Sequence, residues 1–181
     1  IRLSLTPWLN HSWHVALYVT ARGLTTSPIA FDARIFQIDI DFEDHVLRIS
    51  SSEGRYRQMP LRSQAVASFY SELLERLEEL NIFVRINERP NEIPDAIPFT
   101  KDRVHAAYDP HYANSLFKLL VQADRVFKIF RTGFIGKASP VHFFWGSFDL
   151  AVTRFSGRRA PPHPGGAPNL PDAVVREAYS H

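Results

Sequence analysis

Cysteine is absent from this 181-residue chain, and neither sign of charge is in large excess. Without cysteine there are no disulfides, no thiolate catalysis and no cysteine-ligated zinc or iron–sulfur cluster. Lys and Arg number 21 against 19 for Asp and Glu, and this net charge of +2 makes nucleic acid an unlikely partner. No apolar run approaches the length of a membrane span, and no signal-peptide pattern opens the chain. We therefore expect a cytoplasmic protein with no membrane partner.

The familiar catalytic and cofactor-binding signatures are missing as well. The chain has no Walker A loop, Rossmann glycine fingerprint, His-Glu-x-x-His motif, EF-hand loop or Gly-x-Ser-x-Gly elbow. We therefore predict no cofactor and identify no reaction. Whether the protein is an enzyme, and in what oligomeric state it exists, are left open by these residues.

The chain does contain enough apolar residues for a packed core. Hydrophobic residues make up 45% of the sequence, aromatic residues 13% and charged residues 22%, which is typical of a globular domain. We predict a single domain over residues 1–157. Residues 158–181 form a Pro/Gly-rich arm and the start of a C-terminal segment. The missing initiator Met and the helix-like end at His181 predict a fragment truncated at both ends.

The order of periodic segments predicts an α+β fold, with an antiparallel β-meander joined by a long central strand and two main helices packed on the sheet. Alternating apolar residues predict strands over 13–22, 24–29, 34–42, 46–50, 55–61 and 82–87. One helix is predicted from Ser63, its N-cap, to Asn81. Asp109-Pro110 predicts the start of a second helix, whose apolar residues on more than one side indicate that it is widely covered.

The most informative stretch is residues 141–155, VHFFWGSFDLAVTRF. Its apolar content predicts one long central strand that breaks at Gly157. Alternate side chains of a strand point to opposite faces. The face that begins at His142 is mostly apolar and is predicted to be core. The face that begins at Phe143 mixes aromatic residues with Ser, Thr and Asp, as the linings of ligand pockets do.

We predict that a small polar or anionic ligand binds on this mixed face, and that enzymatic activity at the site is possible. If the first strand neighbours the long one, residues from both strands would share one surface. The ligand-binding candidates are His14, Tyr18, Trp145, Ser147, Asp149, Arg154, Arg158 and His163. A His–Asp pair could support general acid–base chemistry. The alternative is that these polar side chains only satisfy buried hydrogen-bonding groups.

Two further clusters can be considered. Arg154, Arg158 and Arg159, with Lys137 nearby, could bind phosphate or carboxylate, or could solvate the arm and pair with acidic helix residues. A metal site would have to draw on His142, Asp149, His163, Glu177 and His181. Their spacing matches no recognised zinc pattern, so we predict no metal.

Three segments, FIGKASPVHFFWGSFDLAVTRFSGRRAPPHPG, TPWLNHSWHVALYVTARGLTTSPI and EAYSH, resemble an uncharacterised bacterial family, a domain of unknown function. The resemblance covers the whole chain and implies further residues at both ends, with a helix before Ile1 and an aromatic-rich segment after His181. A Cys often stands in that family where this chain has Ala138, so a role for that thiol is not carried over. The family implies no activity or catalytic residues.

A rival hypothesis makes the chain a protein-interaction or structural module. In that case the proline-rich arm and the long loop over 89–108 would dock a partner, and the aromatic residues would belong only to the core.

Overall fold

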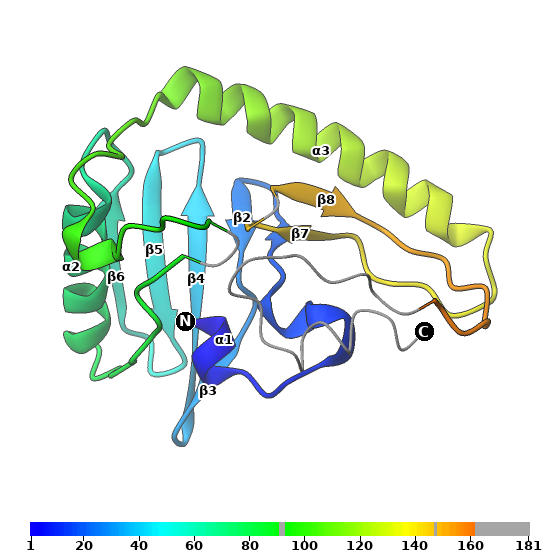
Figure 1. The fold of residues 1–181 in the computed structure, drawn as a ribbon, viewed down its shortest axis with the longest axis horizontal. Helices are drawn as coiled ribbons and strands as arrows, with labels where there is room; N and C mark the ends of the chain where they lie inside the picture. The colour runs from blue at the N-terminus through cyan, green and yellow to red at the C-terminus, as the bar shows by residue number, and fades with distance from the viewer. Residues whose placement is uncertain (91–92, 147, 162–181) are drawn as a thin grey trace.

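A computed structural model describes residues 1–90, 93–146 and 148–161 of the chain. The fold is α+β, as predicted, with an antiparallel six-stranded sheet, a two-stranded hairpin and two long helices (Figure 1). The strands are β1 (Tyr18–Val19), β2 (Gly23–Thr25), β3 (Ile29–Phe31), β4 (Arg34–Asp41), β5 (Val46–Ser51), β6 (Tyr56–Pro60), β7 (His142–Phe144) and β8 (Asp149–Ala151). The helical segments are α1 (Arg2–Leu5), η1 (Asn10–Val15), α2 (Val66–Glu78), η2 (Phe99–Lys101) and α3 (Pro110–Thr132). No helix in these described ranges is long and apolar enough to cross a membrane.

The main sheet has the strand order β1-β2-β4-β5-β6, and β3 pairs with the first part of β4. The meander of β4, β5 and β6 is the one that the alternating pattern predicts. Three of the strands predicted before residue 88 are wrong. The single strand predicted over 24–29 is absent, because β2 ends at Thr25 and β3 begins only at Ile29. Residues 82–87 form no strand. The strand predicted from residue 13 begins only at Tyr18, because His11 and Ser12 have positive φ angles and fold the preceding residues into the 3-10 segment η1.

The long central strand predicted over 141–155 is wrong, because the chain reverses between Phe144 and Asp149 to form the β7–β8 hairpin. His142 pairs with Ala151 and Phe144 with Asp149. A continuous strand needs an equally long neighbour to satisfy its backbone, whereas here each arm supplies hydrogen bonds to the other. Phe148 has a φ of 58° and so helps to reverse the chain. The segment is therefore two short strands rather than one.

The hairpin extends the main sheet through a single residue pair. Leu17 and Phe143 exchange two backbone hydrogen bonds of 2.8 Å. Because Leu17 directly precedes β1, this pair places β7 next to the start of β1. Figure 1 shows β4, β5 and β6 upright and the hairpin beyond β2, running roughly at right angles to them, so the strand direction turns strongly from one end to the other. The condition that the first strand neighbours the 141–155 stretch is thus met.

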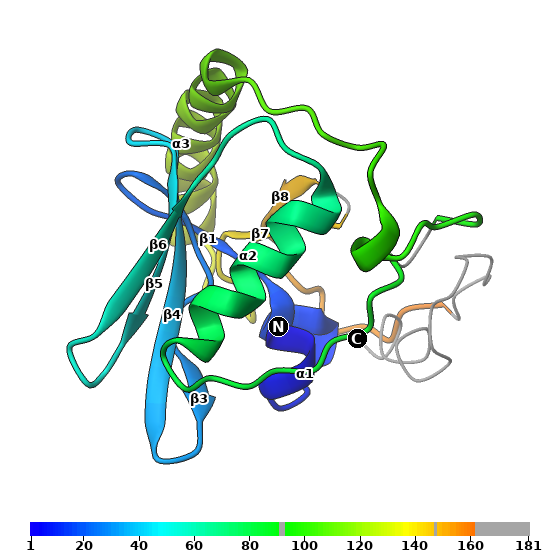
Figure 2. The ribbon, with the colours of Figure 1, turned by 90° about the vertical axis from the view of Figure 1, so that its left-hand side faces the viewer.

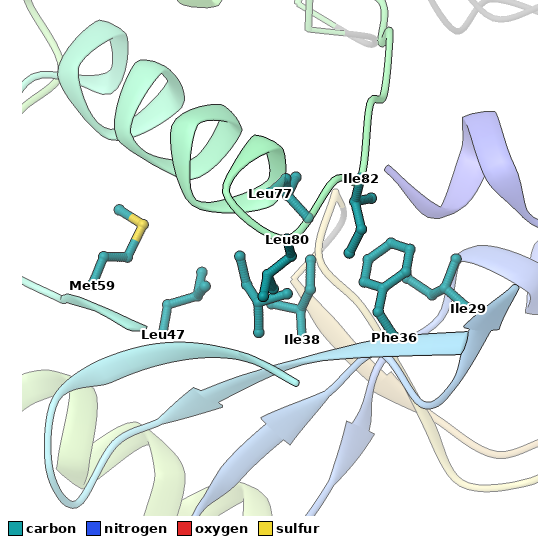
Figure 3. Close-up of a cluster of buried hydrophobic side chains, with 9 residues drawn as sticks. Ile29, Phe36, Ile38, Leu47, Met59, Leu77, Leu80 and Ile82 are labelled. Carbon is teal, nitrogen blue, oxygen red and sulfur yellow. The ribbon is translucent and has the colours of Figure 1, made fainter. Parts of the chain in front are cut away.

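Both long helices pack against the same face of this twisted sheet. The directly paired residues Leu24, Ile40, Leu47 and Met59 form one row of side chains across four strands. Leu47 and Met59 belong to the core beneath α2, shown in Figure 3, whereas Leu24 and Ile40 belong to the core beneath α3. Figure 2 shows α2 over the strands nearest the viewer, with α3 farther along the sheet. One row of side chains therefore joins the two cores.

Chain segments that are distant in sequence cap the two ends of α2. The amides of Val66 and Ala67 donate to the carbonyls of His105 and Asp102, at 3.0 and 2.9 Å. Ser63, the predicted N-cap, instead donates its hydroxyl to the carbonyl of Ala106, and the helix begins three residues later. Beyond the C-terminal end, the Arg34 guanidinium donates to the carbonyls of Leu80 and Asn81.

The start of α3 is the one that the sequence predicts. Asp109 is the N-cap, its side chain accepts from the amides of His111 and Tyr112, and Pro110 is the first helical residue. The predicted wide coverage of this helix is wrong. Phe117 and Leu120 are buried against the sheet, but several apolar side chains on the opposite side are exposed.

Arginines around β4 and α2 pair with carboxylates. Arg34 lies 3.0 Å from Glu53, and both Arg57 and Arg76 pair with Glu79. The alternating pattern of the strand predicted over 34–42 places Asp41 on the solvent-facing side. In the structure Asp41 is buried, and Arg22 lies against it.

Burial on its own would raise the pKa of Asp41. Hydrogen bonds from Arg22 and from the amides of Asp44 and Glu43 outweigh that effect and lower the pKa. The buried carboxylate is therefore held in its charged form.

Candidate functional site

The faces of the β7–β8 hairpin are divided differently from the prediction. Phe143, expected on the ligand face, is fully buried beneath α3 together with Phe117. Its neighbours His142 and Phe144, expected in the core, line a concavity on the opposite side. The reason is the pairing of Phe143 with Leu17, because Leu17 also packs into the core beneath α3.

The concavity measures about 1150 Å³ and is formed by the hairpin arms, η1 and the residues that follow α3. Figures 1 and 2 show the η1 segment beside the hairpin arms. Beyond β7 and β8 the arms stay paired, because the amide of Ser139 donates to the carbonyl of Thr153 and that of Phe155 to the carbonyl of Lys137. Gly157, with a φ of 75°, then turns the chain, and Arg158 and Arg159 complete the lining.

Five aromatic or imidazole rings form a continuous wall in this concavity. His11 lies with its ring centroid 4.8 Å from that of Trp13 and 4.9 Å from that of Phe155. Trp13 is 6.1 Å from His142, which in turn is 4.8 Å from Phe144. The wall offers apolar ring faces and edges to a planar group.

The tautomer of His142 follows from its surroundings. Its Nδ1 lies 2.8 Å from the carbonyl oxygen of Pro140, which can only accept, so Nδ1 is the donor. In the neutral ring, Nε2 is then the acceptor.

Four cationic side chains line the same concavity, namely Lys137, Arg154, Arg158 and Arg159. Among residues 1–90, 93–146 and 148–161, no Asp or Glu lines it. The Arg154 guanidinium lies 3.6 Å from the ring centroid of Phe130 and 5.4 Å from that of Phe134, and the Lys137 ammonium lies 4.9 Å from that of Phe155. Cation–π contacts hold these two groups in place without neutralising their charge. Within residues 1–90, 93–146 and 148–161, none of the four forms an ion pair.

Of the predicted site residues that the structure describes, Arg154 and Arg158 line the concavity and the others do not. Trp145 and Asp149 are exposed at the closed end of the hairpin, where the Trp145 ring lies 6.0 Å from that of Phe143. Tyr18 pairs with Thr25 in the sheet. Ser147 and His163 lie outside the described residues.

His14 is buried away from the concavity. Its ring centroid is 4.6 Å from that of Trp8, and its Nδ1 is 3.3 Å from both the amide and the carbonyl of Leu9. Burial lowers the pKa of His14, and the charge of Arg2 lowers it further, against the opposing effect of the Leu9 carbonyl. The predicted grouping of His14 with Asp149 is not formed, because Asp149 is exposed at the hairpin turn.

The residues that the sequence reasoning missed are His11 and Trp13. Trp13 was predicted to lie in a strand, and His11 was in no predicted element. The positive φ of His11 brings its ring beside Phe155, and such a backbone angle leaves no periodic pattern in the sequence.

The basic cluster of three arginines and Lys137 was recognised, but its pairing with acidic residues was an open alternative. For metals, no group of three or more possible ligands exists in the part of the chain that the structure describes.

The fold and the concavity define a class of protein, an α+β domain with a basic, aromatic-lined hollow beside one end of a twisted antiparallel sheet. Within that class, the chain belongs to DUF5996, a family of unknown function, whose family model matches residues 1–181. No curated protein and no solved structure matches the chain.

Proposed function

We propose that the domain binds a small anionic ligand with a planar apolar part in the concavity between the hairpin arms and η1. The observation that carries the proposal is the combination of four cations with the absence of any carboxylate among the lining residues that the structure describes. Like charges in one hollow repel one another, and an anion that enters relieves this repulsion.

The two kinds of lining residue divide the work of recognition. The guanidinium groups of Arg158 and Arg159 would take a carboxylate or phosphate, because their planar forks match those groups. The wall that includes Trp13, Phe144 and Phe155 would pack against the apolar part of the ligand. A neutral aromatic molecule would use only the wall, and a small inorganic anion only the cations.

Isothermal titration calorimetry with four probes tests the proposal. Benzoate and phenyl phosphate carry both features, benzamide carries the ring without the charge, and acetate carries the charge without the ring. We expect the two aromatic anions to bind at least about ten-fold more tightly than benzamide or acetate, with affinity falling as salt rises.

A double substitution, Arg158→Ala with Arg159→Ala, should weaken phenyl phosphate about ten-fold or more, since a charge-assisted hydrogen bond contributes about 1.5–3 kcal/mol. The matched control is Arg85→Ala with Arg103→Ala, which removes two exposed arginines that lie elsewhere. Equal binding of benzamide and benzoate, or equal loss of affinity in both double variants, would overturn the proposal.

A further inference from the structure

The outer face of α3 carries a stripe of apolar side chains that are exposed in the described part of the chain, although Arg154 lies against Phe130 at its end. Its large apolar side chains are Tyr112, Leu119, Val126, Ile129 and Phe130, and Leu119 is 65% exposed. The helix spans 23 residues, or roughly 34 Å at 1.5 Å per residue. Scattered single apolar residues are common on surfaces, but a row of them along one helix face is typical of an interaction surface.

The spacing of the stripe indicates what kind of partner fits it. Tyr112, Leu119 and Val126 recur every seven residues, and Ser115, Gln122 and Ile129 recur at the same interval between them. Together they occupy the two inward positions of a heptad repeat, the pattern by which one helix packs along another. The first position is apolar throughout, whereas the second carries the polar Ser115 and Gln122 before the apolar Ile129. The buried residues Phe117 and Leu120 lie on the sheet side, so this seam is additional to the core.

The charges beside the seam narrow the choice of partner. His111, Lys118 and Arg125 are exposed and also seven residues apart, so they form a basic line along one side of the stripe. The only acidic residue within α3 is Asp124, which is buried and lies 2.6 Å from the Lys128 ammonium. A partner that complements this face has acidic residues opposite the basic line.

We propose that the outer face of α3 docks an amphipathic helix with an apolar heptad seam flanked by acidic residues. A second copy of α3 is the poorer occupant, because antiparallel packing would bring Lys118 of one copy beside Arg125 of the other. The surface is separate from the ligand concavity, apart from Phe130, which Arg154 also contacts. The two proposals can therefore fail independently.

The test uses two synthetic helical peptides of about 21 residues with the same leucine seam. One has Glu at the positions that flank the seam, and the other has Lys there. We expect the Glu peptide to bind at least about ten-fold more tightly by fluorescence anisotropy, with the difference shrinking at high salt.

Two variants locate the binding. Leu119→Glu with Val126→Glu should abolish binding of the Glu peptide, whereas Ser68→Glu with Ser71→Glu, on the exposed side of α2, should leave it unchanged. Lys118→Glu with Arg125→Glu should reverse the preference, so that the Lys peptide binds more tightly. All four exchanged α3 side chains are exposed, and melting temperatures near that of the unsubstituted protein would show that the fold is kept.

Three results would overturn the proposal. The peptides could bind equally, they could fail to bind, or sedimentation could show a dimer that Leu119→Glu with Val126→Glu converts to monomer. The last result would assign the stripe to a second copy of the chain.

Discussion

Two regions of the molecule, the sheet around β4 and the β7–β8 hairpin, differ in whether their cationic side chains form ion pairs in the described residues. Around β4 and α2, Arg34 and Arg57 each lie within ion-pair distance of a glutamate. Arg22, which lies between β1 and β2, binds the buried Asp41 at the end of β4. Around the hairpin, Lys137 and Arg158 line a hollow in which the described part of the chain places no carboxylate. One fold therefore contains both kinds of arrangement, which shows that unpaired cations are not a general property of this chain. The ion-paired charges stabilise the fold, whereas the cations around the hairpin are those that the proposed function assigns to ligand binding.

The largest effect on stability is expected from removing the buried side chain that anchors the hairpin to the core. Phe143→Ala should lower the free energy of unfolding by about 3–5 kcal/mol, because the ring is fully buried and its removal leaves a cavity. Urea denaturation measures the loss. Trp145→Ala, which removes an exposed ring of the same cluster, should cost clearly less. Equal losses would mean that the core does not hold the hairpin.

The next largest effect on stability is expected at the ion pair between Arg22 and the buried Asp41. Asp41→Ala should lower the free energy of unfolding by about 1–3 kcal/mol, since it leaves the amides of Glu43 and Asp44 without their buried acceptor. The control is Asp44→Ala, which removes the exposed carboxylate that also pairs with Arg22 and should cost at most about 1 kcal/mol. If the two substitutions cost the same, burial of Asp41 contributes nothing.

A third, pH-dependent effect concerns the buried imidazole of His14. Burial lowers its pKa, so the unfolded chain binds more protons than the folded protein between the folded pKa and the unfolded value of about 6.5. Stability should therefore fall as the pH drops from about 6.5 through the folded pKa. Melting temperatures between pH 8 and pH 5 measure this slope. His14→Gln should flatten it, and an unchanged slope would assign the pH dependence to other groups.

The smallest effect is expected where the cations are unpaired. Arg158→Ala should change the free energy of unfolding by no more than about 0.5 kcal/mol, because the side chain is exposed and forms no ion pair among the described residues. Chemical denaturation of this variant beside Asp41→Ala makes the comparison direct. A loss greater than about 1 kcal/mol would show that Arg158 has a structural partner.

The sequence predicted those parts of the fold whose signals are local and periodic. Alternation in Phe36, Ile38 and Ile40 indicated β4, and Asp109-Pro110 indicated the first turn of α3. In both cases the residues that form the element also carry its pattern. The assignment to the α+β class followed from these elements.

The parts that were missed depend on contacts between distant residues. The hairpin turn at residues 145–148 contains no Asn-Gly or Asp-Gly signal, and its aromatic residues resemble a buried strand. Which side of the hairpin is core depends on the pairing of Phe143 with Leu17, more than 100 residues earlier. The lining of the concavity by His11 has the same origin, so the chemistry of the basic cluster could be read from the sequence but its aromatic wall could not.

The capping of α2 by later residues also delays the completion of this helix while the chain is being synthesised. The first two amides of the helix are satisfied by carbonyls of residues 102 and 105, so the helix can leave the ribosome well before the groups that finish it. At about 5–20 residues per second, the delay amounts to a few seconds. During that interval the nascent helix has no side-chain cap of its own at Ala65. A slow stretch of codons after residue 105 would allow this end to close before α3 emerges.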